Sequence, residues 1–269
     1  MMLEAIGITL RLGGREILNA VEFHARPGEI TAIVGPNGSG KTTLLRALTG
    51  DLSHEGQVRL NGRDLASLRP WALAALRGVL PQATPLAFPF TAAEVVRLGL
   101  TAGIEAAETD RVAAALARVG LAGFEGRYYQ ELSGGEQQRV QLARVLVQVW
   151  NPTAHGAPRW LFLDEPVSSL DIGHQLQVMR IARDFADQGG GVVAVMHDLN
   201  LTAMFADAVT LLAEGRVLGH GGPHDVLCDA LLSRAYRCAI RMNTTPREGP
   251  YLLPHAAGHL AAEEVAAAQ

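Results

Sequence analysis

One glycine-rich stretch constrains what this 269-residue chain can fold into more than any other feature. Residues 35–42 read GPNGSGKT, directly after the continuously apolar run 30–34 and directly before the helix-forming segment TLLRALTG. Such an apolar run is typical of a strand buried on both faces. In a turn between a strand and a helix, glycines let successive backbone N–H groups point inward at phosphate oxygens, and the helix adds the positive end of its dipole. The stretch therefore predicts an α/β fold with a phosphate site.

The same loop supplies side chains suited to a triphosphate. Lys41 is the only lysine among 23 basic residues, and its compact ammonium can reach the β- and γ-phosphates. The Thr42 hydroxyl can bind Mg²⁺. The alternative is a chance glycine-rich turn, but the order of strand, loop and helix and the lone lysine argue against it. The nucleotide-binding residues predicted here are Gly35, Pro36, Asn37, Gly38, Ser39, Gly40, Lys41, Thr42 and Thr43.

A second motif ends another apolar run. Residues 160–163 (WLFL) predict a buried strand, and the carboxylates of Asp164 and Glu165 follow it. A magnesium nucleotide needs one carboxylate to hold the metal, which suits Asp164, while Glu165 can polarise the attacking water as general base. Acidic pairs also end strands as solvated turn residues, so the motif alone is weak. Beside the phosphate loop, it predicts a site for ATP and Mg²⁺.

A third motif, LSGGEQQR at 132–139, predicts another helix that begins at an anion site. Ser133 is placed as the N-cap, and Glu136 three residues later completes a capping box. Free N–H groups and a hydroxyl at such a helix start can bind phosphate. A purely structural cap is the alternative reading of an isolated motif of this kind. The binding residues predicted here are Ser133, Gly134, Gly135 and Glu136.

Together these motifs resemble the ATP-binding cassette (ABC) family, whose signature reads LSGGQ, and the resemblance extends to about residue 227. By this resemblance Gln82, in GVLPQAT, is the Q-loop glutamine that senses Mg²⁺, and Asp171, in SSLD, belongs to the nucleotide-binding D-loop. His197, which follows VVAVM, is similar to the switch histidine that contacts the γ-phosphate. The implied catalytic residues are Lys41, Glu165 and His197, and the implied metal-binding residues are Thr42, Gln82 and Asp164.

The resemblance also implies a fold, an α/β P-loop NTPase core with an antiparallel β subdomain and a helical signature subdomain. We expect an ABC ATPase domain at 1–238, with the helical subdomain inserted at about 84–149, and a C-terminal extension at 239–269.

The residue pattern supports this division. Period-two alternation over 3–26 predicts an antiparallel sheet, and 57–60, 78–81 and 192–196 read as strands. Thr91 and Glu94 predict a capping box, and Thr109 with Asp110 opens a second helix through Val119.

Two stretches depart from the family pattern. An aromatic residue commonly stacks on adenine from the first hairpin, but the matching stretch offers only Leu12, or Arg11, to cover the base. Residues 149–159, rich in proline and glycine, form a longer connection than usual, which predicts a surface loop with a solvated His155.

The family mechanism implies a head-to-tail homodimer in which the Lys41 loop of one chain and the Ser133 helix of the other enclose one ATP. Two phosphate-binding helix starts in one chain, for one nucleotide, are consistent with action in trans. Homodimerisation is therefore predicted, together with a polytopic membrane permease in two copies.

Within the family, the run MHDLNLTAMFADAVTLLAEGRVLGHGGPHDVL resembles ATPases of importers for ferric siderophores, cobalamin and haem. WLFLDEP after the extended loop is most similar to haem importer ATPases, which implies a periplasmic haem-binding protein as a further partner. The nine histidines are scattered, and none is expected to contact haem. The permease contact is expected just after Gln82, at Pro85, Leu86, Phe88, Pro89 and Phe90, although hinge or core packing is the plainer reading of these residues.

Composition limits the other possibilities. A net charge of −4 provides no basic field for nucleic acid or anionic lipid. Two cysteines, Cys228 and Cys238, fit neither a redox pair nor a zinc site and favour a reducing cytoplasm. The N-terminus lacks the apolar run of a signal peptide or anchor, so we expect a peripheral protein on the cytoplasmic face of the bacterial inner membrane.

Two other classes of protein fit less well. Soluble ABC ATPases of DNA repair or translation usually carry two cassettes or a long coiled coil, and this chain shows neither. A P-loop kinase or GTPase would lack the LSGGE motif.

Overall fold

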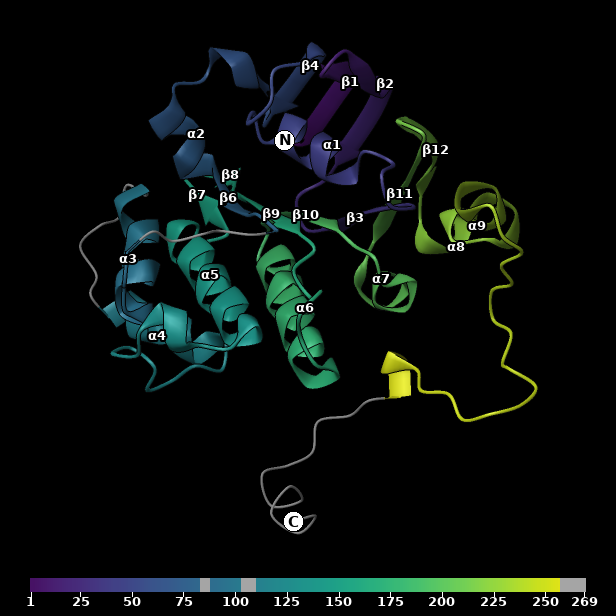
Figure 1. Cartoon of the computed structure of the whole chain (residues 1–269). Helices are drawn as coiled ribbons and strands as arrows, with labels where there is room; N and C mark the ends of the chain where they lie inside the picture. Colours follow the sequence, from purple (N-terminus) through teal and green to yellow (C-terminus); the bar gives the residue numbers. More distant parts are fainter. Residues whose placement is uncertain (83–87, 103–109, 257–269) are drawn as a thin grey trace.

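A computed structural model describes residues 1–82, 88–102 and 110–256 of the chain, and most of this fold consists of a pair of sheets with their covering helices (Figure 1). The smaller sheet is antiparallel, with strand order β2-β1-β4-β5. Its strands are β1 (Leu3–Leu12), β2 (Arg15–Ala25), β4 (Glu55–Leu60) and β5 (Arg63–Asp64). Burial alternates along β1 and β2, so each strand turns one face to the core. The antiparallel sheet predicted at 3–26 is confirmed.

The larger sheet has the order β12-β11-β3-β10-β9-β6 and is parallel except at β12. Its strands are β3 (Ile30–Val34), β6 (Arg77–Leu80), β9 (Trp160–Asp164), β10 (Gly191–Val195), β11 (Ala208–Ala213) and β12 (Arg216–Gly221). Every residue of β3, β9 and β10 is buried, as their continuous apolar runs predict. Because these three strands are parallel neighbours, the loops after them emerge at one edge of the sheet.

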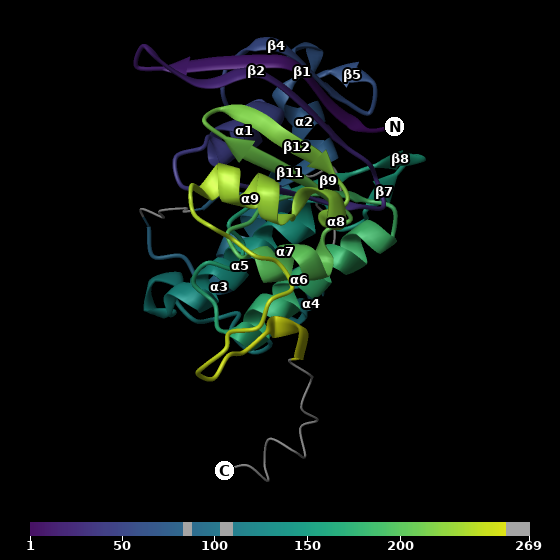
Figure 2. The same cartoon turned by 90° about the vertical axis from the view of Figure 1, so that its right-hand side faces the viewer.

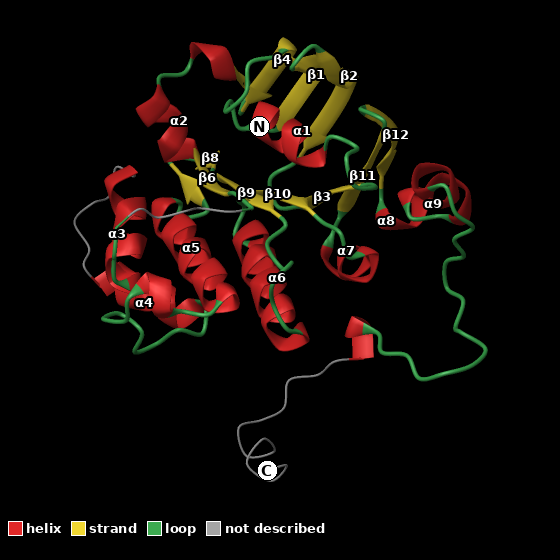
Figure 3. Ribbon diagram, in the orientation of Figure 1, coloured by secondary structure: helices red, strands yellow, loops and turns green. Residues whose placement is uncertain are grey.

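Side chains of the central strands alternate between two cores. Ile33, Phe162 and Val193 face the core shared with the antiparallel sheet and helix α1 (Lys41–Leu48). Ala32, Leu161 and Val192 face the core shared with the helices on the other side of the sheet. Figure 3 shows this layering, with α1 between the two sheets and the longer helices beneath the parallel one.

The segment between β6 and β9 is helical, as predicted. Its helices are α3 (Ala92–Ala102), α4 (Asp110–Arg118) and α5 (Gly134–Gln148), and α2 (Pro70–Leu76) precedes β6. The predicted capping box is present, since the Thr91 N–H donates to Glu94 Oε2 at 2.8 Å and the Glu94 N–H donates to Thr91 Oγ1 at 3.3 Å. Residues 84–87, where the predicted subdomain begins, and Thr109, the predicted start of the second helix, lie outside the described residues.

The connection predicted as a surface loop at 149–159 is instead a short β-hairpin. Strands β7 (Thr153–Ala154) and β8 (Ala157–Pro158) pair antiparallel, and His155 at φ 51° with Gly156 at φ 75° makes the turn. The tip is exposed, as expected for His155, but Arg159 at the base is buried and its N–H donates to Pro152 O at 2.7 Å. The proline- and glycine-rich composition concealed this pairing, because the turn uses a left-handed histidine.

After β12 the chain forms α8 (Pro223–Val226) and α9 (Asp229–Tyr236) and then runs without regular structure to a short turn at Pro254–Ala256. Figure 2 shows this last stretch descending past the ends of α6 (Ile172–Asp187) and α7 (Leu199–Phe205). The stretch starts close to α9, because the Met242 N–H donates to Asp229 Oδ1 at 2.8 Å. The predicted tail beyond residue 256 lies outside the described residues.

Two expectations from composition can be compared with the structure. Cys228 and Cys238 are both free thiols. Across residues 1–82, 88–102 and 110–256, every helix is too short or too polar to cross a bilayer.

Candidate functional site

A cavity of about 1230 Å³ opens where the loops leave the carboxyl edge of the parallel sheet. Four backbone segments line it, at 15–17, 36–43, 214–215 and 235–237, together with the side chains of Gln82, Glu165 and His197. The motifs predicted the segment 36–43 and these three side chains, but not the other three segments. The cavity is large enough for a nucleotide, since pockets for drug-sized ligands usually measure about 300–1,000 Å³.

The glycine-rich loop is held in a conformation that larger residues would not allow. Gly35 has a φ of 151°, and a Cβ placed there would lie 2.0 Å from the carbonyl oxygen of Leu212 in β11. Gly40 has a φ of 102° and caps α1 without any side-chain hydrogen bond. The first amides of α1 are therefore free to bind an anion.

Lys41 is buried, with an exposed fraction of 6%, and its ammonium points back into the loop. Its Nζ donates to Gly35 O at 2.9 Å and to Pro36 O at 3.1 Å. Burial lowers the pKa of Lys41, and the charges of Glu165 and Asp164 oppose that shift. The only lysine of the chain thus donates to two carbonyl groups of the loop. A bound triphosphate would give its ammonium an anionic partner in their place.

Thr42 and Asp164 come together from sequence positions far apart. Thr42 Oγ1 donates to Asp164 Oδ1 at 3.1 Å. Burial raises the pKa of Asp164, the nearby charge of Glu165 adds to the effect, and the hydrogen bond from Thr42 opposes it. A buried carboxylate beside a hydroxyl is the donor pair that Mg²⁺ prefers, so these residues fit the metal.

Glu165 has both carboxylate oxygens engaged. Gln82 Nε2 donates to Oε2 at 3.0 Å, and His197 Nε2 lies 2.7 Å from Oε1. The backbone of Glu165 has a φ of 51°, and its N–H donates to Val195 O at 3.2 Å across the end of β10. Left-handed backbone at a non-glycine residue is common at functional sites, and here it brings the carboxylate to the mouth of the phosphate loop. Gln82 therefore contacts Glu165 rather than the Thr42–Asp164 pair with which it was grouped.

The second predicted anion site lies elsewhere. Ser133, the N-cap of α5, and Gly134, its first residue, are both exposed. None of residues 133–136 lines the cavity. The predicted capping box is complete, because the Ser133 N–H donates to Glu136 Oε2 at 2.7 Å and the Glu136 N–H donates to Ser133 Oγ at 3.3 Å. These hydrogen bonds from the Ser133 hydroxyl and backbone hold the pKa of Glu136 below its ordinary value.

Helix α5 nevertheless contacts the loop that follows β9 in the same chain. Gln138 Nε2 donates to the carbonyl oxygen of Glu165 at 3.1 Å. The signature motif and the general-base candidate are thus connected within one chain, although only Glu165 lines the cavity.

Asp171 lies at the start of α6, as an exposed N-cap. Its Oδ1 accepts the His174 N–H at 3.0 Å, and its Oδ2 lies 2.8 Å from His174 Nδ1. These two hydrogen bonds keep the pKa of Asp171 low. Within the chain Asp171 is a helix cap outside the cavity, so its predicted nucleotide contact stays a prediction.

The expected cover for the base, Leu12 or Arg11, stays a prediction. Leu12 and Arg11 are exposed and lie outside the cavity lining, whereas Arg15, Glu16 and Ile17 line it from the start of β2. The start of the strand that follows the turn at 13–14 thus forms one wall of the cavity.

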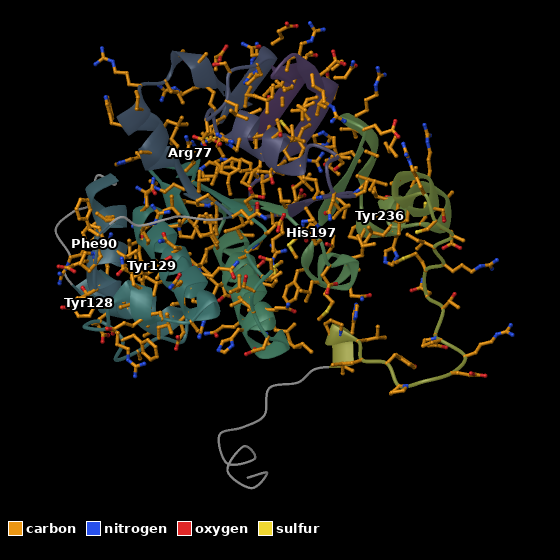
Figure 4. The ribbon with its side chains drawn as sticks, viewed as in Figure 1. Arg77, Phe90, Tyr128, Tyr129, His197 and Tyr236 are labelled. Carbon is orange, nitrogen blue, oxygen red and sulfur yellow. The ribbon has the colours of Figure 1, made fainter. Side chains whose placement is uncertain are left out.

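Sequence reasoning also missed the wall made by Ala235, Tyr236 and Arg237. Burial raises the pKa of Tyr236, and a hydrogen bond with the backbone of Gly35 opposes the shift. Figure 4 shows Tyr236 and His197 at a similar level below the antiparallel sheet. No motif surrounds residues 235–237, so the sequence offered no signal for their position.

Apolar side chains gather on the helical subdomain, away from the cavity. Phe88 is 66% exposed and lies edge-on to the half-buried Phe90, with ring centroids 6.3 Å apart. Tyr128 is also exposed, and Figure 4 places Phe90, Tyr128 and Tyr129 in this region of the molecule. Pro85 and Leu86, which were predicted to belong to the same permease contact, lie outside the described residues.

Comparison with known proteins gives one consistent result. The family model described as ABC transporter matches residues 18–168. The "hemin import ATP-binding protein HmuV" of Roseobacter denitrificans is 62% identical to this chain and aligns over 97% of it and 100% of that protein. The protein of the same name from Jannaschia sp. is 63% identical over 95% of each chain.

Solved structures agree on the fold. An ATP-binding subunit of an ABC transporter superposes with a TM-score of 0.74 at 22% identity, over 89% of this chain and 95% of that one. A dimeric ATP-binding cassette in a post-hydrolysis state with ADP and phosphate superposes with a TM-score of 0.72 at 26% identity, over 82% of this chain and 99% of that one.

Proposed function

Because this chain belongs to the ABC transporter family, we propose that it is the ATP-hydrolysing subunit of an importer that takes up haem (hemin) through a membrane permease. Relatives named for hemin import that are 62% and 63% identical over nearly the whole chain carry this assignment. The phosphate cradle with Lys41, and Glu165 at its mouth, supply the chemistry that such a subunit needs.

The chain's own residues account for nucleotide binding and for the first proton transfer. The loop amides and the Lys41 ammonium bind the phosphate oxygens and neutralise the charge that builds up as the terminal phosphoryl group is transferred. The Glu165 carboxylate accepts a proton from water, whose oxygen forms a bond to the γ-phosphorus as the bond to the bridging oxygen of ADP breaks. His197 and Gln82 hold that carboxylate until nucleotide and water exchange for one of them.

Thr42 and Asp164 are the residues that would hold Mg²⁺. When bound, the metal supplies positive charge at the β- and γ-phosphate oxygens. Gln82 is a further metal-binding candidate, since its amide oxygen could contact the ion once the amide nitrogen leaves Glu165.

The separation of the two anion sites supports a homodimer. The start of α5 at 133–136 lies outside the cavity of its own chain, so it can complete only a site on another copy. In this arrangement Ser133, Gly134 and Gly135 close over the γ-phosphate held by the partner's loop, and Asp171 lies near the junction. The dimeric cassette with ADP and phosphate has a closely similar fold.

The exposed aromatic residues near α3, Phe88 and Tyr128 among them, form the proposed contact with the permease, which is present in two copies. A periplasmic haem-binding protein would deliver cargo on the other side. This assembly places the chain on the cytoplasmic face of the inner membrane, as a peripheral subunit without a haem contact of its own.

Transport by reconstituted vesicles tests the proposal. The chain and its permease are incorporated together, ATP is supplied on the cassette side, and hemin, a ferric siderophore or cobalamin is offered separately with its binding protein. We expect only hemin to accumulate, and only with the wild-type chain and not with Glu165→Gln. Uptake of the siderophore or cobalamin instead would overturn the cargo, and hemin uptake by Glu165→Gln would overturn the mechanism.

A further inference from the structure

Besides the phosphate loop, the cavity is lined by segments of the chain that no nucleotide motif includes. The start of β2 contributes Arg15 and Ile17, the β11–β12 turn contributes Glu214, and the end of α9 contributes Tyr236 and Arg237. With the phosphates on the loop at 36–43, the base and ribose must lie against other parts of the lining, and these three segments are such parts. What the three segments can do for a base therefore depends on their side chains.

The β11–β12 turn is held firmly against the phosphate loop. The Gly215 N–H donates to Ser39 O at 3.1 Å, and Gly215 O accepts the Asn19 N–H at 2.9 Å. A Cβ at Gly215 would lie 2.3 Å from Ile17 O, so the turn, β2 and the loop are in close contact. Glu214 immediately precedes this glycine, so its backbone lies beside the phosphate loop.

Arg237 is oriented by the carboxylate of Glu214. Its Nη2 donates to Glu214 Oε1, and both side chains are about three-quarters exposed, at 77% and 74%. A guanidinium held at its edge by a carboxylate keeps its two flat faces free, and such faces stack on aromatic rings and bases. Exposure of this kind leaves room for a ligand above the guanidinium.

Tyr236 lies between this segment and the phosphate loop. Its ring packs against the core, and it lines the same cavity as Pro36 and the rest of the loop. Arg237 itself has a φ of 56° and ends the helix, so its side chain leaves α9 at a set angle beside the cavity. Arg237 is therefore carried on a backbone segment that lines the same cavity as the loop that holds the phosphates.

We propose that the end of α9 is the base-binding wall of the nucleotide site, with the Arg237 guanidinium stacked on the purine in place of the aromatic residue missing from the first hairpin. This inference rests on the proposed function, since it takes the cavity as an ATP site. It adds a specificity residue from the C-terminal region of the chain to that site.

Titration calorimetry on the purified full chain tests the wall with Mg²⁺ and three ligands, ATP, ADP and inorganic tripolyphosphate. Arg237→Gly removes the side chain and suits the left-handed backbone, while Arg237→Lys keeps the charge but not the flat face. Arg234→Ala, an exposed arginine on the same helix outside the cavity lining, is the matched control. We expect both Arg237 variants to weaken ATP and ADP by roughly five- to tenfold and to leave tripolyphosphate and the control unchanged.

Other results have definite meanings. Full ATP affinity in Arg237→Gly, or an equal loss for ATP and tripolyphosphate, overturns the stacking role. Full affinity in Arg237→Lys also overturns it, because charge alone would then suffice. If the wild-type chain itself binds tripolyphosphate but not ATP, the proposed function fails first, and the wall fails with it.

Discussion

Helices α1 and α5 both begin at an anion site, but they begin in opposite ways. Helix α1 starts at the buried Gly40, which leaves its first amides without a side-chain partner. Helix α5 starts at Ser133, whose capping box with Glu136 already satisfies some donors of the helix end on an exposed surface. The first start forms a complete cradle within one chain, whereas the second can add only a few donors to a ligand held by something else.

The difference shows why one chain has both. A loop that encloses phosphate must be buried, and burial requires glycine, because side chains would collide with the neighbouring strand at Gly35. A helix start that closes over a ligand held by another chain must be exposed, and an exposed start needs its own cap to stay folded. Each helix start is built for its environment, and the following variants test that comparison in order of expected effect.

The largest effect is expected from Lys41→Arg. Lys41 is buried and its compact ammonium donates to two carbonyl groups of its own loop, a geometry that the wider planar guanidinium of arginine does not reproduce. We expect ATP hydrolysis to fall by roughly 10²-fold or more. Phosphate release under saturating ATP measures it, and wild-type turnover would show that the cradle accepts any cation.

Next in size is Gly35→Ala, with Gly38→Ala as its matched control. Both glycines have positive φ, but a Cβ at Gly35 meets Leu212 O at 2.0 Å whereas a Cβ at Gly38 meets nothing within 4 Å. We expect Gly35→Ala to lower the free energy of unfolding by about 3 kcal/mol or more, and Gly38→Ala by about 1–2 kcal/mol. Urea denaturation separates the two, and equal losses would mean that burial of the loop is unimportant.

A smaller effect on stability and a selective effect on turnover are expected from Ser133→Ala. Loss of the cap should cost about 1 kcal/mol of stability. Loss of a donor to the partner's phosphate should slow hydrolysis by roughly ten- to a hundredfold, with ATP affinity of the isolated chain unchanged. Thr91→Ala removes the equivalent cap of α3 and should reduce stability alike without slowing hydrolysis. A slowed Thr91→Ala enzyme would argue that the rate follows stability rather than position.

The smallest effect is expected from Glu136→Gln, read as a pH dependence. The folded-state pKa of Glu136 lies below its ordinary value, so its contribution to stability is present above the ordinary pKa of glutamate and is lost as the pH falls through the lowered one. Thermal unfolding between neutral and acidic pH should therefore show a shallower acid dependence in Glu136→Gln, by roughly a few tenths of a kcal/mol. An unchanged dependence would mean that the amide caps α5 as well as the carboxylate does.

Much of this organisation could be predicted from local sequence. The buried strands, the phosphate loop and both capping boxes depend on residues within a few positions of one another, and the predictions made from them hold. The family resemblance was needed to single out Gln82 and His197 as site residues, but it did not predict their contacts with Glu165, from which they are 83 and 32 positions away.

Two features escaped prediction for different reasons. The hairpin at 153–158 depends on a left-handed histidine that no turn rule favours strongly. The wall at 235–237 reaches the cavity through tertiary packing. Because β11 lies beside β3, the end of α9 returns to the phosphate loop at 36–43. Neither partner carries a motif that refers to the other.

The burial of Lys41 also has a practical consequence. As the sole ε-amine of the chain, it leaves amine-directed reagents with only that nitrogen and the N-terminal amino group as targets. An acyl group that reached Lys41 would remove the positive charge of the only ammonium in the phosphate loop, so acetylation at this position would inactivate the protein.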